Sequence, residues 1–204
     1  TFIYNGLTMK KILAGFLDII EFFVSSSAIA ILIYLFVTQP HQVNGSSMYP
    51  NLHDGEFLLT DKLTYKLRNP QRGDIVIFDA PAQAHCPTGL NCDFIKRIIG
   101  MPGERIKVEK GQIFINGNKV TEPYENLVKG TGSGFSGNSF LVEGMEKTIP
   151  ENQYIVMGDN RPGSSDSRDW GPISKSSIVG KAWLRYWPPN VAGVLAFDKA
   201  EIDN

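Results

Sequence analysis

The sequence predicts a mainly β domain, built on antiparallel β-sheet, behind a single N-terminal transmembrane helix. One long apolar run extends from Ile19 to Val37, and no comparable run follows in the 204-residue chain. After it the pattern changes to short alternating segments that turn residues interrupt. The gaps between these segments are too short for the helical crossovers that parallel strands require, so antiparallel pairing is expected.

The apolar run is long enough to cross a bilayer. At about 1.5 Å per residue it measures roughly 28 Å, close to the ~30 Å hydrocarbon core. A cleaved secretory signal is one alternative, because Lys10 and Lys11 resemble its charged n-region. The exit at Thr38 to Pro40, however, has no small-x-small cleavage site. A buried soluble helix would be apolar on one face, whereas this run is apolar all round. A transmembrane helix over residues 19–38 is therefore predicted.

Basic residues predict the orientation of the span. Lys10 and Lys11 precede it, and no lysine or arginine follows until Lys62. Under the positive-inside rule, residues 1–18 form a cytoplasmic tail. Residues 39–204 then form an extracytoplasmic, β-rich domain on the outer side of the plasma (inner) membrane, in a single-pass topology.

Short alternating segments are expected to form the strands of this domain. Lys110-Gly111 and Asn116-Gly117-Asn118 mark two tight hairpins. No helical period stands out after residue 60. The predicted strands are Glu56–Thr60, Asp74–Phe78, Phe94–Ile99, Arg105–Glu109, Gln112–Ile115, Tyr154–Met157 and one within Ile178–Trp187.

Composition and motifs disfavour two classes of ligand. A formal charge of −1 leaves no basic footprint for nucleic acid. The glycine-rich stretch 130–138 has neither a following Gly-Lys-Ser/Thr nor the βαβ context of a phosphate-binding loop. We expect this stretch to be a surface loop.

The two cysteines, Cys86 and Cys92, lie six positions apart. A small loop-closing disulfide is favoured if the domain is extracytoplasmic. Two free thiols are the second possibility. A metal site that includes His85 and Asp93 is the third, but two cysteines without a second ligand pair are a weak metal motif.

A serine and a lysine carry the candidate chemistry. Ser47 follows the span by ten residues, at most about 35 Å of extended chain, and a serine is a poor nucleophile until a base takes its proton. Lys96 stands in an apolar strand, on the same face as Phe94 and Ile98, where desolvation lowers a lysine pKa from ~10.4. A lysine snorkelling to water is the structural alternative. The three histidines, His41, His53 and His85, show no pattern typical of a Ser-His-Asp triad.

Four ordered motifs resemble those of type I signal peptidases, the membrane-bound Ser/Lys enzymes that remove signal peptides. The resemblance runs from the span to about Pro189, and it implies a more variable β subregion at about 106–153. The motifs are the nucleophile segment Gly45–Leu52 with its Ser47-Met48-x-Pro50, the strand Gly73–Phe78, the base segment Phe94–Glu104 and the box Gly158–Gly171.

The resemblance implies a role for several polar residues. Ser47 matches the nucleophile, Lys96 the general base, and Ser164 a serine whose hydroxyl orients that base. Asp166 and Arg168 match a structural ion pair, and Asp159 a supporting acid. The oxyanion hole should include the Ser47 backbone N–H. Gly45 stands where some members carry a serine that donates a second hydrogen bond.

The same resemblance implies the partners of the site. Signal peptides of exported preproteins are the expected substrate, cut after a small residue. Gly45, Met48, Phe94 and Ile95 are predicted to bind them. Membrane lipid and the protein-export machinery are further expected partners, and no cofactor or metal is expected. The apolar residues Val43, Met48, Tyr49 and Phe57 either touch the bilayer, line the cleft or pack in an ordinary core.

Three other functions remain open at this point. A self-cleaving repressor uses a similar Ser/Lys pair, but it would carry a DNA-binding helical domain where this chain has a span. A peptidase that processes conjugation pilins would share the motifs. A non-catalytic, membrane-anchored β domain is the third, and it is disfavoured because Ser47, Lys96 and Ser164 all occur in register.

Overall fold

The computed structural model divides the chain into two compact units, residues 1–39 and residues 40–204. The described residues are 2–84, 86, 92–123, 132, 139–195 and 201–202, with the backbone alone for 2–10 and 201. In chain order the helices and strands are α1 (Phe2–Phe36), β1 (Thr38–Gln42), β2 (Phe57–Asp61), α2 (Thr64–Leu67), β3 (Ile75–Asp79), β4 (Asp93–Gly100), β5 (Arg105–Glu109), β6 (Gln112–Ile115), β7 (Asn118–Thr121), β8 (Glu146–Thr148), β9 (Gln153–Met157), η1 (Arg161–Gly163), α3 (Ser167–Trp170), β10 (Ile173–Ser174), η2 (Lys175–Ser177), β11 (Ile178–Trp187), η3 (Pro189–Val191), β12 (Gly193–Val194) and β13 (Glu201–Ile202).

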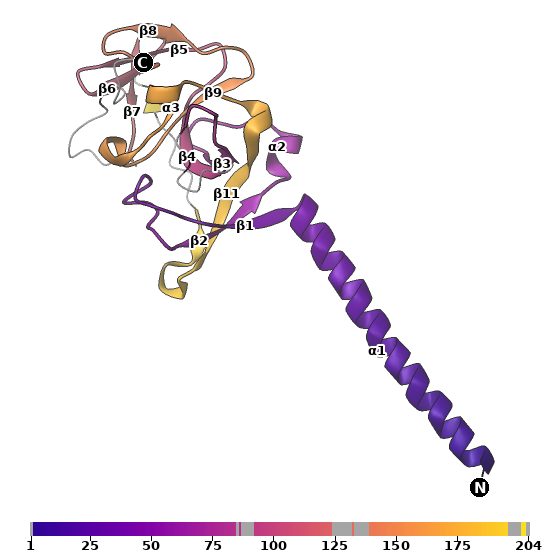
Figure 1. The fold of residues 1–204 in the computed structure, drawn as a ribbon. Coiled ribbons are helices and arrows are strands. Elements are labelled where there is room, and N and C mark those ends of the chain that lie inside the picture. The colour runs from indigo at the N-terminus through magenta and orange to yellow at the C-terminus, as the bar shows by residue number, and fades with distance from the viewer. Residues whose placement is uncertain are drawn as a thin grey trace. The chain divides into compact units, whose positions relative to one another are not determined.

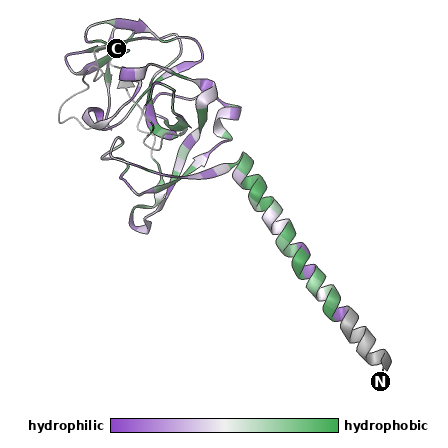
Figure 2. Ribbon diagram, in the orientation of Figure 1, coloured by the Kyte–Doolittle hydropathy of each residue, from purple (hydrophilic) through white to green (hydrophobic). Residues whose placement is uncertain are grey.

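The first unit consists mainly of the helix α1, and it ends within β1. Its segment Lys11–Phe36 is long and apolar enough to cross a membrane, and none of that segment is buried in the protein. Figure 2 shows apolar colouring along most of it. The helix begins at Phe2, well before the predicted span, because no proline interrupts the preceding residues. The predicted tail, residues 1–18, is therefore helical from Phe2 onward.

The second unit contains two sheets (Figure 1). The larger, eight-stranded sheet has the order β1-β2-β11-β3-β4-β9-β10, with β12 beside β11. The smaller, five-stranded sheet has the order β13-β7-β6-β5-β8. Every strand pair whose register is defined runs antiparallel. The predicted fold class, a mainly β domain of antiparallel sheet behind one N-terminal helix, is confirmed.

The longer predicted strands are all present. β5 and β6 match the prediction residue for residue, and the other boundaries differ by about one residue. Lys110 and Asn116, in the two predicted hairpin turns, have φ of 51° and 52°, a conformation that turn residues tolerate. The strands β1, β8, β10, β12 and β13 were not predicted, and β7 was implied only by the second hairpin turn. β8, β10, β12 and β13 have two or three residues, too few to show an alternation, and Pro40 in β1 argues against a strand.

The larger sheet has a core on both faces. Along β3, Ile75 and Ile77 pack on one side, in a cluster that also contains Met48 and Leu52. On the other side Val76 packs with residues of β4, β9 and β10, together with Phe78. The turn that carries the candidate nucleophile is therefore anchored in one of the two cores of this sheet.

Burial decides the place of the four apolar residues near that turn. Val43 and Met48 are 3% and 1% exposed and pack in the core. Of the three alternatives left open for these residues, packing in the core is the one that holds for Val43 and Met48. Phe57 is half-buried, whereas Tyr49 remains 46% exposed.

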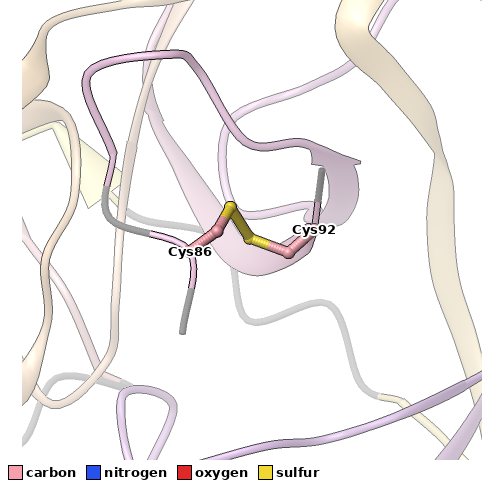
Figure 3. The surroundings of a disulfide bond; sticks show 2 residues. All are labelled: Cys86 and Cys92. Atoms are coloured by element: carbon pink, nitrogen blue, oxygen red, sulfur yellow. A yellow bond between two sulfur atoms is a disulfide. The ribbon is translucent and has the colours of Figure 1, made fainter. Parts of the chain in front are cut away.

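Cys86 and Cys92 form a disulfide, with their Cα atoms 6.0 Å apart (Figure 3). The first of the three alternatives for these cysteines is thus the one that the structure contains. The bond closes the loop that leads into β4 at Asp93. The glycine-rich stretch 130–138, apart from Gly132, lies outside the described residues.

Replacing both cysteines, Cys86→Ser with Cys92→Ser, should lower the free energy of unfolding by about 2 kcal/mol, because a short closed loop removes only modest entropy from the unfolded chain. The comparison is between melting curves of the variant and of the parent, measured without reductant. A parent protein that already shows two free thiols on labelling under denaturing, non-reducing conditions would contradict the disulfide.

Candidate active site

Strand β4 places Lys96 beside Ser47. The Lys96 side chain is 5% exposed, and its Nζ lies 2.8 Å from Ser47 Oγ and 3.2 Å from the carbonyl oxygen of Ile95. The Nζ also lies 5.2 Å from the centre of the Phe94 ring. The pair spans 49 positions of sequence, so it forms only when the turn after β1 packs against the sheet.

Burial changes the ionisation of this lysine. Desolvation lowers the pKa of the Lys96 ammonium from 10.5 to about 8. The carboxylates of Asp166 and Asp159 oppose this shift, and the guanidinium of Arg168 adds to it. About half of the Lys96 amine is therefore neutral at pH 8, and a neutral amine can accept the serine proton.

A compact turn presents Ser47. The Tyr49 N–H donates to the Ser46 carbonyl at 3.1 Å, and the Leu52 N–H donates to the Met48 carbonyl at 2.9 Å. Met48 and Leu52 point into the core, which fixes the turn that Ser47 begins. Ser47 itself is only partly buried, so its hydroxyl remains open to a substrate.

Gly45, two residues before the nucleophile, adopts a conformation that suits glycine. Its φ is +86°, and its N–H donates to Asp54 Oδ1 at 2.6 Å. A side chain at this position would be strained by the backbone even though the space around it is open. Residue 45 therefore contributes no hydroxyl to the site.

Asp159 lies in a buried ion pair that supports the turn. Arg97 donates to both of its carboxylate oxygens, at 2.8 and 2.7 Å, and Asn51 Nδ2 donates at 2.8 Å. Strand alternation places Arg97 on the face of β4 opposite Lys96. This partner of Asp159 was not identified from the sequence, although a charged residue in an apolar strand indicates that a buried counter-ion exists.

The predicted ion pair of Asp166 and Arg168 is present. Arg168 donates to both carboxylate oxygens of Asp166, at 2.8 and 2.9 Å, and all of these side chains are buried. Asp166 also accepts the N–H of Gly158 at 3.1 Å. A Cβ on Gly158 would collide with Ser164 and with the Ser47 carbonyl, so only glycine permits this approach.

A third buried pair, which sequence analysis missed, joins the box to the smaller sheet. Arg161 donates to both carboxylate oxygens of Glu122, at 2.9 and 2.6 Å, just after β7. Neither side chain is exposed to solvent by more than 2%. Because Glu122 lies 39 positions away from Arg161, no local pattern could have linked them.

Ser164 differs from the expectation. Its side chain is 1% exposed, but its Oγ has no hydrogen-bond partner among the described residues. The implied bond to Lys96 is not made, because the lysine amine points to Ser47 and to the Ile95 carbonyl instead. The base-orienting role of Ser164 stays a prediction.

A cleft of about 340 Å³ opens in front of the serine and the lysine. The four residues predicted to bind substrate all line it. Two short stretches form most of its wall, one after β1 and one at the start of β4. Its lining residues are Gln42, Val43, Asn44, Gly45, Ser46, Ser47, Met48, Asp93, Phe94, Ile95, Lys96, Gly163 and Ser165.

The described histidines lie away from the nucleophile. His41 contacts Thr60 and Asp93, at 2.7 and 3.1 Å, and His53 lies beside Glu56. His85 lies outside the described residues. Within the described part of the chain, no group of three His, Cys, Asp or Glu side chains is arranged to hold a metal ion.

Comparison with known proteins places this geometry in a family. The model of the family "Signal peptidase, peptidase S26" matches residues 16–187. The chain belongs to this signal peptidase family. A probable signal peptidase I-2 of Synechocystis is 35% identical over 175 residues, which cover 86% of this chain and 75% of that protein. Signal peptidase IB of Staphylococcus aureus is 32% identical over 181 residues, which cover 84% of this chain and 91% of that protein.

A solved structure is also similar. The crystal structure of a signal peptidase I from Enterococcus faecalis V583 aligns with a TM-score of 0.41 and 30% sequence identity. The alignment covers 56% of this chain and 97% of that one. The family assignment itself rests on the sequence matches. Family membership makes the chain a membrane-anchored serine endopeptidase that cleaves signal peptides from preproteins.

Replacing the buried lysine by an apolar side chain, Lys96→Met, should stabilise the fold at neutral pH. The pKa of Lys96 is about 8 in the folded protein and 10.5 in the unfolded chain. The buried ammonium therefore lowers the free energy of unfolding by its full amount below pH 8, and it has no such effect above about pH 10.5. The expected gain is about 3 kcal/mol at pH 7 and disappears toward pH 10.5. Melting curves of parent and variant at pH 7 and pH 10 test this, and an equal gain at both pH values would contradict it.

Proposed function

We propose that Ser47 is the nucleophile and Lys96 the general base of this signal peptidase. The observation that supports both roles is the 2.8 Å contact between Lys96 Nζ and Ser47 Oγ at the cleft. A non-catalytic anchored β domain would have no reason to bury a lysine against a serine hydroxyl, because the desolvation costs stability.

Acylation begins when the substrate lies in the cleft with its scissile carbonyl next to Ser47. The serine proton passes to the neutral Lys96 amine as the oxygen–carbon bond forms, and the carbonyl oxygen takes the negative charge. When the tetrahedral intermediate collapses, the carbon–nitrogen bond breaks and Lys96 returns the proton to the leaving amine. The mature protein departs, and the end of the signal peptide remains as an ester on Ser47.

Deacylation repeats these steps with water. Lys96, neutral again, takes a proton from a water molecule that attacks the ester carbonyl. Collapse of the second tetrahedral intermediate breaks the bond to Ser47 Oγ, and Lys96 returns the proton to the serine. In both halves of the reaction the Ser47 N–H donates to the oxyanion.

The residues of the box have supporting roles in this proposal. Asp166 with Arg168, and Asp159 with Arg97, are buried ion pairs that hold the segment 158–168 against the turn. Ser164 is proposed to orient the Lys96 amine. A buried hydroxyl without a partner is costly, so a hydrogen bond between it and Lys96 during the reaction would be favourable.

The cleft is proposed to bind the end of the signal peptide. Gly45 and Met48 contribute one part of its wall, and Phe94 and Ile95 contribute the other. The first part is the turn that carries Ser47, and the second is the start of strand β4. A peptide in extended conformation between them would bring its scissile bond to Ser47, with specificity for small side chains next to the cut.

The proposed topology puts the catalytic unit outside the membrane. Lys10 lies just before the apolar segment of α1 and Lys11 is its first residue, so the N-terminus is cytoplasmic and the chain crosses the plasma (inner) membrane once. The signal peptides of preproteins are inserted in the membrane that α1 crosses, and we propose that their ends enter the cleft from there. Lipid and the protein-export machinery are the proposed further partners.

Replacing the nucleophile, Ser47→Ala, should abolish cleavage of a preprotein and leave the melting temperature close to that of the parent, because little packing changes. The assay incubates detergent-solubilised full-length protein with a preprotein and identifies the cut by mass spectrometry. Comparable turnover in this variant would place the nucleophile elsewhere, with Ser46 the first residue to test.

The rate should rise with pH through about 8, because Lys96 must lose its proton before it can act as a base. The dependence of kcat/KM on pH measures this ionisation in the free enzyme. Lys96→Arg should be nearly inactive at every pH, since a guanidinium keeps its proton. A profile that is flat from pH 5 to 9, or full activity of Lys96→Arg, would exclude lysine as the base.

A further inference from the structure

Asn160 contacts both peptide groups that flank the nucleophile. Its side-chain Nδ2 donates to the carbonyl oxygen of Ser46 at 3.0 Å, and its backbone N–H donates to the carbonyl oxygen of Ser47 at 3.0 Å. The Ser46 carbonyl also accepts the N–H of Tyr49 at 3.1 Å. The peptide plane between Ser46 and Ser47 is thus held from one side by two donors.

The direction of the Ser47 N–H follows from this contact. The Ser46–Ser47 peptide bond is trans, since the cis bonds of the described chain precede Pro50 and Pro188. In a trans peptide the C=O and the N–H point in opposite directions. Because the Ser46 carbonyl faces Asn160, the Ser47 N–H must face away from Asn160.

That N–H is available to a substrate. Ser46 and Ser47 are among the described residues that line the cleft, and Asn160 is not. No acceptor in the described part of the chain takes the Ser47 N–H. A donor without a partner, next to the serine oxygen and turned away from the residue that anchors its peptide, is placed to bind a developing oxyanion.

We propose that Asn160 is a positioning residue: it fixes the Ser46–Ser47 peptide plane so that the Ser47 N–H is aimed at the oxyanion. The inference rests on the proposed role of Ser47 as nucleophile. Asn160 touches neither the substrate nor the reacting atoms, and it acts through the peptide that it holds. Two hydrogen bonds to the Ser46 carbonyl also polarise that peptide, which strengthens its N–H as a donor.

The orientation of the Ser47 N–H is especially important here because Gly45 has no side chain that could donate a second hydrogen bond to the oxyanion. Gly45, with its φ of +86°, holds the chain in a conformation where a serine would be strained. The backbone N–H of Ser47 is therefore a principal donor for the oxyanion, and a small rotation of its peptide plane would weaken the stabilisation of the transition state. Removing one oxyanion donor typically lowers kcat by about 10²–10³-fold. A donor that is present but wrongly oriented should lower kcat by no more than that.

The test compares two variants of the full-length protein in detergent. Asn160→Asp has the same shape but no N–H donor, and Asn160→Ala removes the side chain without adding a charge. For each, kcat and KM are measured on a peptide substrate. The affinity is measured for a peptide boronate with a small last residue, which bonds to Ser47 Oγ and places an oxygen where the oxyanion forms.

We expect kcat to fall by about tenfold to 10² in both variants, with KM unchanged, because only the transition state uses the donor. The inhibition constant of the boronate should rise by the same factor. In Asn160→Ala the pH at which the rate rises should stay at about 8, since neither Lys96 nor a charge near it is altered. In Asn160→Asp the new carboxylate should raise it, as the carboxylates of Asp159 and Asp166 already raise the Lys96 pKa. A residue that merely stabilised the turn would not make the loss of boronate affinity follow the loss of kcat.

Asn51→Ala is the matched control. It removes a 2.8 Å side-chain hydrogen bond from the same turn to Asp159, but does not touch the peptide between Ser46 and Ser47. It should lower the melting temperature at least as much as Asn160→Ala does, without weakening boronate binding relative to KM. Near-UV circular dichroism verifies folding, and if repulsion between the new carboxylate and the carbonyls unfolds Asn160→Asp, then Asn160→Ala decides.

The outcomes separate this inference from the proposed function. Parental kcat and boronate affinity in both Asn160 variants, together with an inactive Ser47→Ala, would overturn the positioning role and leave the nucleophile in place. A fall in kcat without a fall in boronate affinity would also overturn it. An active Ser47→Ala would instead overturn the proposed function itself.

Discussion

The active site depends on one constraint: the amine of Lys96 is buried beside the hydroxyl of Ser47 and has no counter-ion of its own. A buried ammonium normally demands a carboxylate, and two buried carboxylates, Asp159 and Asp166, raise the Lys96 pKa. Each of them, however, has an arginine that donates to both of its oxygens. The charges of these pairs largely cancel at the lysine, so desolvation dominates and the pKa falls.

This arrangement costs stability, and the rest of the domain offsets the cost. Buried ion pairs gain little over an apolar core, but removing one partner leaves an uncompensated charge. Arg97, Arg161 and Arg168 are among the largest fully buried side chains, and each pairs with a carboxylate that lies elsewhere in the fold or two residues away. They join the turn of Ser47, the strand of Lys96 and the smaller sheet into one hydrogen-bonded unit. The hydrophobic clusters on both faces of β3 stabilise the fold and offset the destabilising effect of these buried charges.

The sequence predicted the parts of the site that local patterns encode. Alternation located β3, β4, β5 and β6, and the motifs around Ser47 and Lys96 predicted the two residues that the fold brings within 2.8 Å. The partners of the buried arginines were beyond its reach, because Arg97 and Asp159 lie 62 positions apart and no pattern along the chain connects them. The hydrogen bond between Ser164 and Lys96 was expected from the family resemblance alone. It is absent because the Lys96 side chain points to other acceptors, and sequence does not encode that direction.

The contacts of the box explain why so many small residues surround the catalytic pair. Gly158 must pass the Ser47 carbonyl and Ser164 so closely that no Cβ fits. That approach lets the next residues reach the turn, where Asn160 meets two successive carbonyls. A Cβ on Gly163 would lie 2.7 Å from Asn160 Nδ2, so this glycine leaves room for the amide that makes one of those contacts. Reactivity at Ser47 therefore requires close backbone packing as well as Lys96. The lysine amine accepts the proton of the serine hydroxyl. The glycines let Asn160 approach the turn closely enough to hold the peptide plane between Ser46 and Ser47.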